Sequence, residues 1–230
     1  MEILKRKEVC EQLGRKMRIG VYGGSFNPVT VSHTAVARYV MDRTGLLDEV
    51  WFMPCYGHMY GKKLVSAEHR LEMCRIAVSI HDGLSVFPYE IDHQLSGATY
   101  QTLKLLLNDE RYDYVEVHLI IGTDCANDFN SWVDFDQLNR LAKFIVVPRK
   151  GVKPNALSRR FFGPPHVYLD SDSYGFPESC VTSSTAVREK IKSWLSENSH
   201  YPPFDVMREQ LFEPVYEYII EHKLYVLDGE

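Results

Sequence analysis

Short runs of β-branched and aromatic residues alternate in this chain with segments whose apolar residues recur at helical spacing. This alternation is the pattern of repeated strand–helix units, which form a parallel sheet. We therefore expect the α/β fold class, with a doubly wound parallel sheet and helices on both of its faces. The six expected strands are Arg18–Tyr22, Glu49–Met53, Ser85–Pro88, Val115–Ile121, Phe144–Val147 and Val167–Leu169.

Four helices are expected among these strands and after them. Gly45 is placed to end the first helix, because glycine readily takes the left-handed conformation found just past a helix C-terminus. Ser66 is placed to cap the start of the second helix. The apolar stripes of the four helices are expected to be core: Val36, Tyr39 and Val40; Leu71, Cys74 and Val78; Leu103, Leu106 and Leu107; and Val187, Ile191, Trp194 and Leu195.

Composition excludes several classes of partner and location. The 230 residues are 45% hydrophobic, which is enough to build a core, and the net charge of −5 gives no bulk attraction to a nucleic acid polymer or an anionic membrane. Apolar stretches such as Phe144–Val147 are far shorter than the roughly 20 residues of a membrane span. Because Met1–Met17 also lacks the apolar stretch of a secretory signal, we expect a cytoplasmic protein.

The cysteines give no framework of their own. There are five, scattered along the chain without a C-x-x-C pair, so neither a disulfide scaffold nor a cysteine zinc site is expected. The histidines are also scattered without metal-ligand spacing. We therefore expect reduced thiols and no protein-bound metal site.

The strongest local signal is the segment Gly23–His33, which reads G-G-S-F-N-P-V-T-V-S-H between the first strand and the first helix. Two glycines let backbone N–H groups approach an anion, and the following helix presents its positive end to that anion. The segment therefore predicts a phosphate cradle at the carboxyl edge of the sheet. It is neither a Walker loop nor a G-x-G-x-x-G motif. A glycine turn alone is equally compatible with a purely structural role.

The pattern G-x-F-N-P-x-T-x-x-H within this segment resembles the signature of the nucleotidylyltransferase superfamily, specifically its nicotinamide/nicotinate mononucleotide adenylyltransferases. Many members carry H-x-G-H where this chain has Thr30-Val31-Ser32-His33. The threonine form resembles the eukaryotic-type enzymes more than the usual bacterial nicotinate type. The resemblance implies a Rossmann-like fold and a catalytic role for His33, which matches the second histidine, with Thr30 in place of the first.

A second segment, Thr182–Arg188, resembles the S-S-T-x-x-R motif that grips the ATP polyphosphate in the same family. Ser184 is placed to cap the start of a helix, Thr185 offers donors there, and Arg188 lies one turn on over the same face. A guanidinium beside a helix N-terminus favours a bound polyanion. Alone, the motif would indicate an ordinary capped helix with an exposed arginine.

Further segments match the family more loosely, and each has a plain structural alternative. Lys62 and Lys63 are candidate phosphate ligands or a solvated pair, and Arg70 either reaches the mononucleotide or forms a surface ion pair with Glu68 or Glu72. The resemblance implies ATP and phosphate contacts for Gly23, Gly24, Ser25, Phe26, Lys62, Lys63, Ser183, Ser184, Thr185 and Arg188. It implies mononucleotide contacts for Asn27, Arg70, Thr99, Thr102, Gly122, Asp124 and Trp132, the last by stacking on the pyridine ring unless it is core.

The resemblance covers residues 18–225, including a C-terminal helical part from about 180, and leaves 1–17 as an N-terminal extension. It implies transfer of the adenylyl group of ATP to nicotinamide or nicotinic acid mononucleotide, with release of pyrophosphate. The implied cofactor is Mg²⁺, bound mainly through the ATP phosphates. Another nucleotidylyltransferase, such as a pantetheine-phosphate adenylyltransferase, and a non-catalytic nucleotide-binding regulator are the alternatives. The sequence does not decide whether the protein forms a homo-oligomer, or whether it prefers nicotinamide or nicotinic acid mononucleotide.

Overall fold

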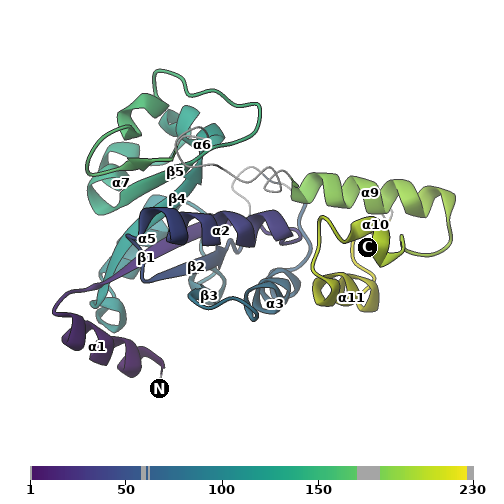
Figure 1. The fold of residues 1–230 in the computed structure, drawn as a ribbon, viewed down its shortest axis with the longest axis horizontal. Helices are drawn as coiled ribbons and strands as arrows, with labels where there is room; N and C mark the ends of the chain where they lie inside the picture. Colours follow the sequence, from purple (N-terminus) through teal and green to yellow (C-terminus); the bar gives the residue numbers. More distant parts are fainter. Residues whose placement is uncertain (1, 58–60, 62, 170–181, 227–230) are drawn as a thin grey trace.

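The computed structural model describes residues 2–57, 61, 63–169 and 182–226 and contains one six-stranded parallel sheet (Figure 1). The strand order is β3-β2-β1-β4-β5-β6. The strands are β1 (Met17–Gly24), β2 (Glu49–Pro54), β3 (Leu84–Val86), β4 (Val115–Gly122), β5 (Lys143–Val147) and β6 (Val167–Tyr168). Each expected strand is present, with ends that differ by at most two residues, which confirms the α/β fold class.

Helices connect the strands and follow them. The α-helices are α1 (Glu2–Leu13), α2 (Val31–Thr44), α3 (Ala67–Val78), α4 (Tyr89–Asp92), α5 (Thr99–Leu107), α6 (Thr123–Asn127), α7 (Phe135–Leu141), α9 (Ser184–Glu197), α10 (Phe204–Met207) and α11 (Glu213–Glu221). Short 3₁₀ turns lie at η1 (Glu110–Tyr112), η2 (Phe129–Ser131) and η3 (Ser158–Phe161). Within the described part of the chain, no helix is long and apolar enough to cross a membrane.

The two faces of the sheet bury separate sets of side chains, because successive residues of a strand point to opposite sides. One face buries Phe52 and Ile145 against α2, α3, α9 and α11. The other buries Val21 and Trp51 against α5 and α7. Helices therefore cover both faces, as the doubly wound fold requires. The expected apolar stripes lie in these two cores except for Leu71 and Trp194, which belong to neither cluster.

Two of the three expected helix ends are confirmed. Gly45 takes a left-handed conformation with φ 58°, and its N–H bonds the carbonyl of Met41. Ser66 caps α3 by accepting from the N–H of His69. The third is wrong by one residue: Ser183, not Ser184, caps α9, because its hydroxyl accepts from the N–H of Ala186.

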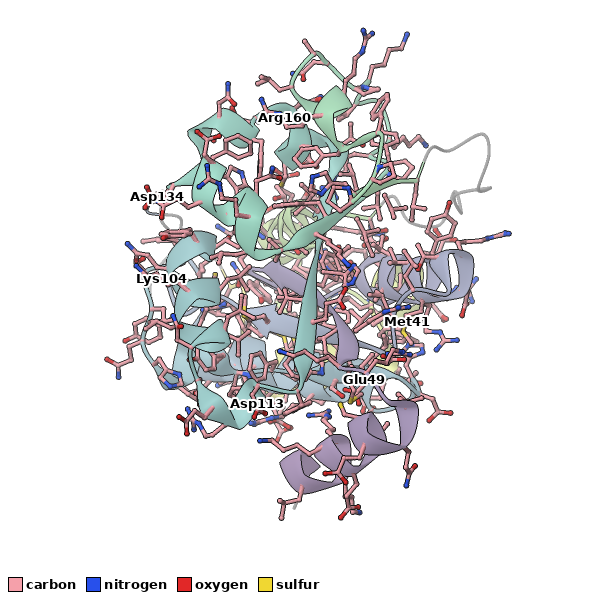
Figure 2. All side chains as sticks on the ribbon, turned by 90° about the vertical axis from the view of Figure 1, so that its left-hand side faces the viewer. Met41, Glu49, Lys104, Asp113, Asp134 and Arg160 are labelled. Carbon is pink, nitrogen blue, oxygen red and sulfur yellow. The ribbon has the colours of Figure 1, made fainter. Side chains whose placement is uncertain are left out.

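The N-terminal helix α1 docks at the amino ends of the strands. Arg6 donates to both carboxylate oxygens of Glu49, and Lys7 pairs with Asp113 at 2.8 Å. Glu49 and Asp113 lie beside α1 in Figure 2. This end of the sheet is the one away from the carboxyl edge, so α1 is separate from the site described below.

The C-terminal helices gather on one side of the sheet, where α11 packs against α3 (Figure 1). Leu224 and Tyr225 follow α11 and are buried. The hydroxyl of Tyr225 donates to the side-chain oxygen of Asn27 at 3.1 Å. The end of the chain therefore closes against the segment that follows β1.

Candidate active site

A cavity of about 560 Å³ opens at the carboxyl edge of the sheet, between β1 and β4. The strand order reverses between these two strands, and ligands of open α/β sheets bind at such a switch point. The volume is in the range of small-molecule sites. Seven of the residues assigned from sequence line it: Gly23, Gly24, Ser25, Thr99, Gly122, Asp124 and Trp132.

The two glycines of the first motif end β1 instead of forming a turn after it. Gly23 pairs with Met53 and Gly24 with Pro54 in the parallel ladder. A Cβ on Gly24 would lie 3.1 Å from the ring of Phe26, so glycine leaves room for that ring. The reversal itself comes at Phe26, where φ is 44°.

Phe26 does not line the cavity, which does not favour the ATP contact assigned to it. Its side chain is 2% exposed and packs beneath the site. The ring centroid lies 5.1 Å from that of His33 in an edge-on arrangement and 5.3 Å from that of Phe52. Phe26 therefore supports the ring of His33 from below.

Thr30 and His33 form a reciprocal cap at the start of α2. The backbone N–H of Thr30 donates to Nδ1 of His33 at 3.0 Å, and the Thr30 hydroxyl lies 2.8 Å from the same nitrogen. Because Nδ1 accepts a hydrogen bond from a backbone amide, this network assigns the ring proton to Nε2. His33 is thus a fixed Nε2–H donor.

His33 is neutral in the free protein. Burial lowers the pKa of the half-buried imidazole to about 4, and the positive charge of Arg149 acts in the same direction. A neutral imidazole keeps its Nε2–H at every pH above this value. The side chain can therefore donate a hydrogen bond without being an imidazolium.

The second motif is joined to the first by three hydrogen bonds. The hydroxyl of Ser184 donates to the carbonyl of Pro28 at 2.7 Å, and the N–H of Thr182 donates to the hydroxyl of Ser32 at 2.9 Å. Arg188 donates to the carbonyl of Asn27 at 2.7 Å. Segments 150 or more residues apart in sequence therefore form one corner of the molecule.

At this corner the second motif presents polar side chains at the surface, where a ligand can reach them. Thr185 is exposed at the first turn of α9, and the second amine of Arg188 lies 3.3 Å from its hydroxyl. The Ser183 hydroxyl is used by the cap. Ser183, Ser184, Thr185 and Arg188 lie outside the cavity lining, beside the start of α2.

Arg70 is a buried support and not a surface residue, so its ion pair with Glu68 or Glu72 is wrong. Its side chain is 1% exposed. The guanidinium donates to the carbonyls of Val65, Ser25 and Tyr56 at 3.1, 2.9 and 2.9 Å. Ser25 follows β1, and Tyr56 and Val65 both lie in the loop after β2, so these bonds tie the two loops together.

Asn27 and Thr102 are also buried and lie outside the cavity lining, which does not favour the mononucleotide contacts assigned to them. The side-chain oxygen of Asn27 accepts from the N–H of Val65 and from Tyr225. The hydroxyl of Thr102 donates to Glu90 at 2.9 Å. Both side chains position neighbouring segments.

Asp124 and Trp132 face the cavity from the segment after β4. A Cβ on Gly122 would lie 2.3 Å from the carboxylate of Asp124, so glycine lets that side chain fold back over the strand end. The half-buried ring of Trp132 rests on Phe129, with 5.2 Å between centroids. Asp124 thus presents acceptors and Trp132 an aromatic face to a ligand.

Of the two lysines assigned in the loop after β2, the structure describes Lys63. Lys63 is exposed and does not line the cavity. Lys62 lies outside the described residues.

Among the cavity residues that the sequence assignment does not include are two charged ones, Arg149 and Glu90. Arg149 directly follows β5, and its guanidinium is 54% exposed and 3.7 Å from the carboxylate of Asp124. Its place just past a predicted strand, at the edge where ligands bind, is a signal that sequence reasoning can use. Glu90 follows no recognisable motif and is revealed only by its burial.

Within the described residues, no group of three or more His, Cys, Asp and Glu side chains is arranged to hold a metal ion. The four described cysteines, Cys10, Cys55, Cys74 and Cys125, are free thiols. This donor set fits a cation that binds mainly through substrate phosphates and water.

Comparison with known sequences gives a consistent result. A sequence model described as cytidylyltransferase-like matches residues 21–190. A probable nicotinate-nucleotide adenylyltransferase of Enterococcus faecalis is 32% identical over 226 residues, covering 97% of this chain and 91% of the relative. One of Myxococcus xanthus is 37% identical over 157 residues, covering 67% and 78%. Both are bacterial nicotinate enzymes by name, although Thr30 resembles the eukaryotic-type motif.

Comparison with solved structures supports the fold. A Plasmodium falciparum nicotinic acid mononucleotide adenylyltransferase complexed with NaAD aligns with a TM-score of 0.70 at 21% identity. The alignment covers 91% of this chain and 97% of the other. The two chains therefore share their architecture over nearly their whole length.

Proposed function

The chain belongs to the cytidylyltransferase-like family and, within it, groups with the nicotinate-nucleotide adenylyltransferases, and on this premise we propose that it joins ATP to a pyridine mononucleotide and releases pyrophosphate. The names of its relatives favour nicotinic acid mononucleotide as the acceptor. The observation that carries the proposal is the joining of the two motifs at one corner, beside a cavity at the switch point of the sheet.

The reaction needs no deprotonating base. The phosphate of the mononucleotide already carries a nucleophilic oxygen at neutral pH, so catalysis reduces to positioning and to stabilising charge on the transferring phosphoryl group. His33 holds a fixed Nε2–H for that purpose, and Thr30 fixes it. A donor aimed at developing charge contributes most in a water-excluded site.

Cationic and hydroxyl donors surround the phosphates in this proposal. Thr185 and Arg188 bind the β- and γ-phosphates from the start of α9, with Ser183 and Ser184 holding that corner together. Arg149 approaches from the end of β5, on the side of His33. Lys63, exposed in the loop after β2, is a further candidate for phosphate contact in this proposal.

The mononucleotide occupies the part of the cavity between α5 and α6. Trp132 stacks on the pyridine ring, and Asp124 accepts from ribose hydroxyls. Thr99 lines the same wall at the start of α5. Gly23, Gly24 and Ser25 form the floor between the two substrates.

Mg²⁺ completes the proposed site. Bound through ATP phosphates and water, it would neutralise the charge of the departing pyrophosphate. A cytoplasmic location agrees with free thiols at the four described cysteines.

Pyrophosphate release tests the proposal directly. The full chain is incubated with ATP, Mg²⁺ and, in separate reactions, nicotinic acid mononucleotide, nicotinamide mononucleotide and phosphopantetheine. We expect release with one or both pyridine mononucleotides only. Release with phosphopantetheine alone would favour the other transferase, and nucleotide binding without any release would favour the regulator.

A further inference from the structure

Glu90 is a buried carboxyl group in the wall of the cavity. It lies in α4, is 4% exposed, and lines the cavity together with Thr99 and Trp132. Its Oε1 accepts from the hydroxyl of Thr102 at 2.9 Å. Its Oε2 is buried and has no hydrogen-bond partner among the described residues.

An unpaired carboxylate oxygen is costly to bury, so it needs a partner that the protein does not provide. Glu116, by contrast, binds both His118 and Lys143. Among the described residues the free Glu90 oxygen has no donor, and its place in the cavity wall lets a bound ligand supply one.

The surroundings of Glu90 leave its charge weakly compensated. Arg70 on α3 is the cation that faces it, but its guanidinium donates to three backbone carbonyls. The Cys55 thiol faces it from the loop after β2, and the backbone N–H of Tyr56 lies nearby. From α5 it receives only the neutral hydroxyl of Thr102. Burial raises the pKa of the carboxyl group, against the smaller opposing effects of these neighbours.

This carboxyl group lies where the proposed function puts the pyridine substituent. A ring stacked on Trp132 shares the cavity with Gly97, Ala98 and Thr99, which lie at the end of the segment from α4 to α5. A carboxamide offers N–H donors at this wall, whereas a carboxylate offers acceptors only. The amide substrate therefore needs Oε2 as a hydrogen-bond acceptor, whereas the acid substrate needs it as a donor.

We propose that Glu90 is a specificity-determining residue that distinguishes the acid from the amide substrate by its own protonation. An ionised Glu90 accepts from the N–H of the carboxamide. A protonated Glu90 donates to the carboxylate of the acid, and the proton comes from solvent on binding and returns on release. This inference rests on the proposed function and adds Glu90 as the group that contacts the carboxamide or carboxylate of the pyridine ring.

The protonation states make the preference depend on pH. Above the pKa of Glu90, the acid must bind together with a proton, so the acid-to-amide ratio of kcat/KM falls by up to about tenfold per pH unit. Titrations common to both substrates, such as those of the phosphate group and of His33, cancel in this ratio.

The first experiment measures the ratio from pH 5.5 to 9 in the wild type, in Glu90→Gln and in a control, Glu72→Gln, whose carboxylate is 43% exposed on α3. Glutamine keeps an acceptor for Thr102 and adds a permanent donor. We expect a falling ratio in the wild type and in the control, and a flat ratio in Glu90→Gln that exceeds the wild-type value at pH 9. The same slope in Glu90→Gln and in the wild type would overturn the proposal.

The second experiment needs no variant. Calorimetric binding of the two mononucleotides to the wild-type protein at pH 8, in buffers of different ionisation enthalpy, gives the protons taken up by each. We expect uptake of about one proton more for the acid than for the amide. Equal uptake would refute the role of Glu90. Failure of the proposed function itself would be distinct, because neither mononucleotide would then release pyrophosphate.

Discussion

The backbone N–H of Thr30 lies 3.0 Å from Nδ1 of His33, so the first residue of the cap fixes the tautomer of the third residue of the helix. The cap thus does two things with one bond: it satisfies an amide at the start of α2 and leaves Nε2 of His33 as a donor. The hydroxyl of Thr30 reinforces the bond at 2.8 Å. The hydrogen bonds that begin α2 are therefore also the ones that orient the proposed catalytic group, His33.

Replacing His33 by alanine removes the donor proposed for the transferring phosphoryl group. We expect kcat to fall about 10²- to 10³-fold, as for other donors to developing charge, while the KM for ATP changes little. Steady-state kinetics measures both, and circular dichroism checks that α2 is retained. A kcat unchanged from that of the wild type would remove His33 from the mechanism.

Thr30→Val separates the hydroxyl from the backbone amide. The variant keeps the N–H that bonds Nδ1 and loses only the hydroxyl contact. We therefore expect a kcat loss much smaller than that of His33→Ala, on the order of tenfold. A loss equal to that of His33→Ala would mean that the hydroxyl itself contacts substrate.

The free protein should hold His33 neutral through the physiological range. Its pKa of about 4 lies below the usual value of 6.5, so the unfolded state binds more protons between these two values. Stability contributed by the neutral ring is therefore present above pH 6.5 and is lost as the pH falls towards 4. Imidazole ¹⁵N spectra should report an Nε2–H tautomer without titration from pH 5 to 8. Titration near pH 6.5 would contradict the assignment.

Arg149→Met tests the residue that sequence reasoning missed. Its cation lies close enough to lower the pKa of His33 and faces the cavity. We expect the pKa of His33 to rise in the variant and the KM for ATP to increase about tenfold or more. Arg159→Met, at an exposed arginine on η3, is the control and should leave both quantities unchanged. A change in neither quantity would exclude Arg149 from the phosphate site.

The strands and the first motif are predictable from sequence because their signals are local. β-Branched runs fix the strands to within two residues, and the glycine pair locates the end of β1, although the reversal itself comes at Phe26 and not in a glycine turn. The cap of α9 is a harder case. Ser183 and Ser184 are adjacent and chemically identical, and the choice depends on the carbonyl of Pro28, which holds Ser184 from across the molecule.

The roles of Arg70 and Glu90 are not predictable in this way. Arg70 has a helical neighbourhood rich in charge, which favours a surface residue, but its three acceptors come from two loops that meet only in the fold. Glu90 likewise depends on Thr102 and on burial by α5. Long-range contacts decide both, and a single sequence does not contain them.

Arg70→Met should destabilise the protein strongly, because it leaves the carbonyls of Ser25, Tyr56 and Val65 buried without their donor. An unsatisfied buried group costs about 1–3 kcal/mol, so we expect the free energy of unfolding to fall by about 3 kcal/mol or more. Urea unfolding measures this loss. The control is Arg75→Met on the same helix, where the side chain is 54% exposed and pairs with Glu72, and its effect should stay within about 0.5 kcal/mol. Equal stability of the two variants would mean that the two loops hold their positions without Arg70.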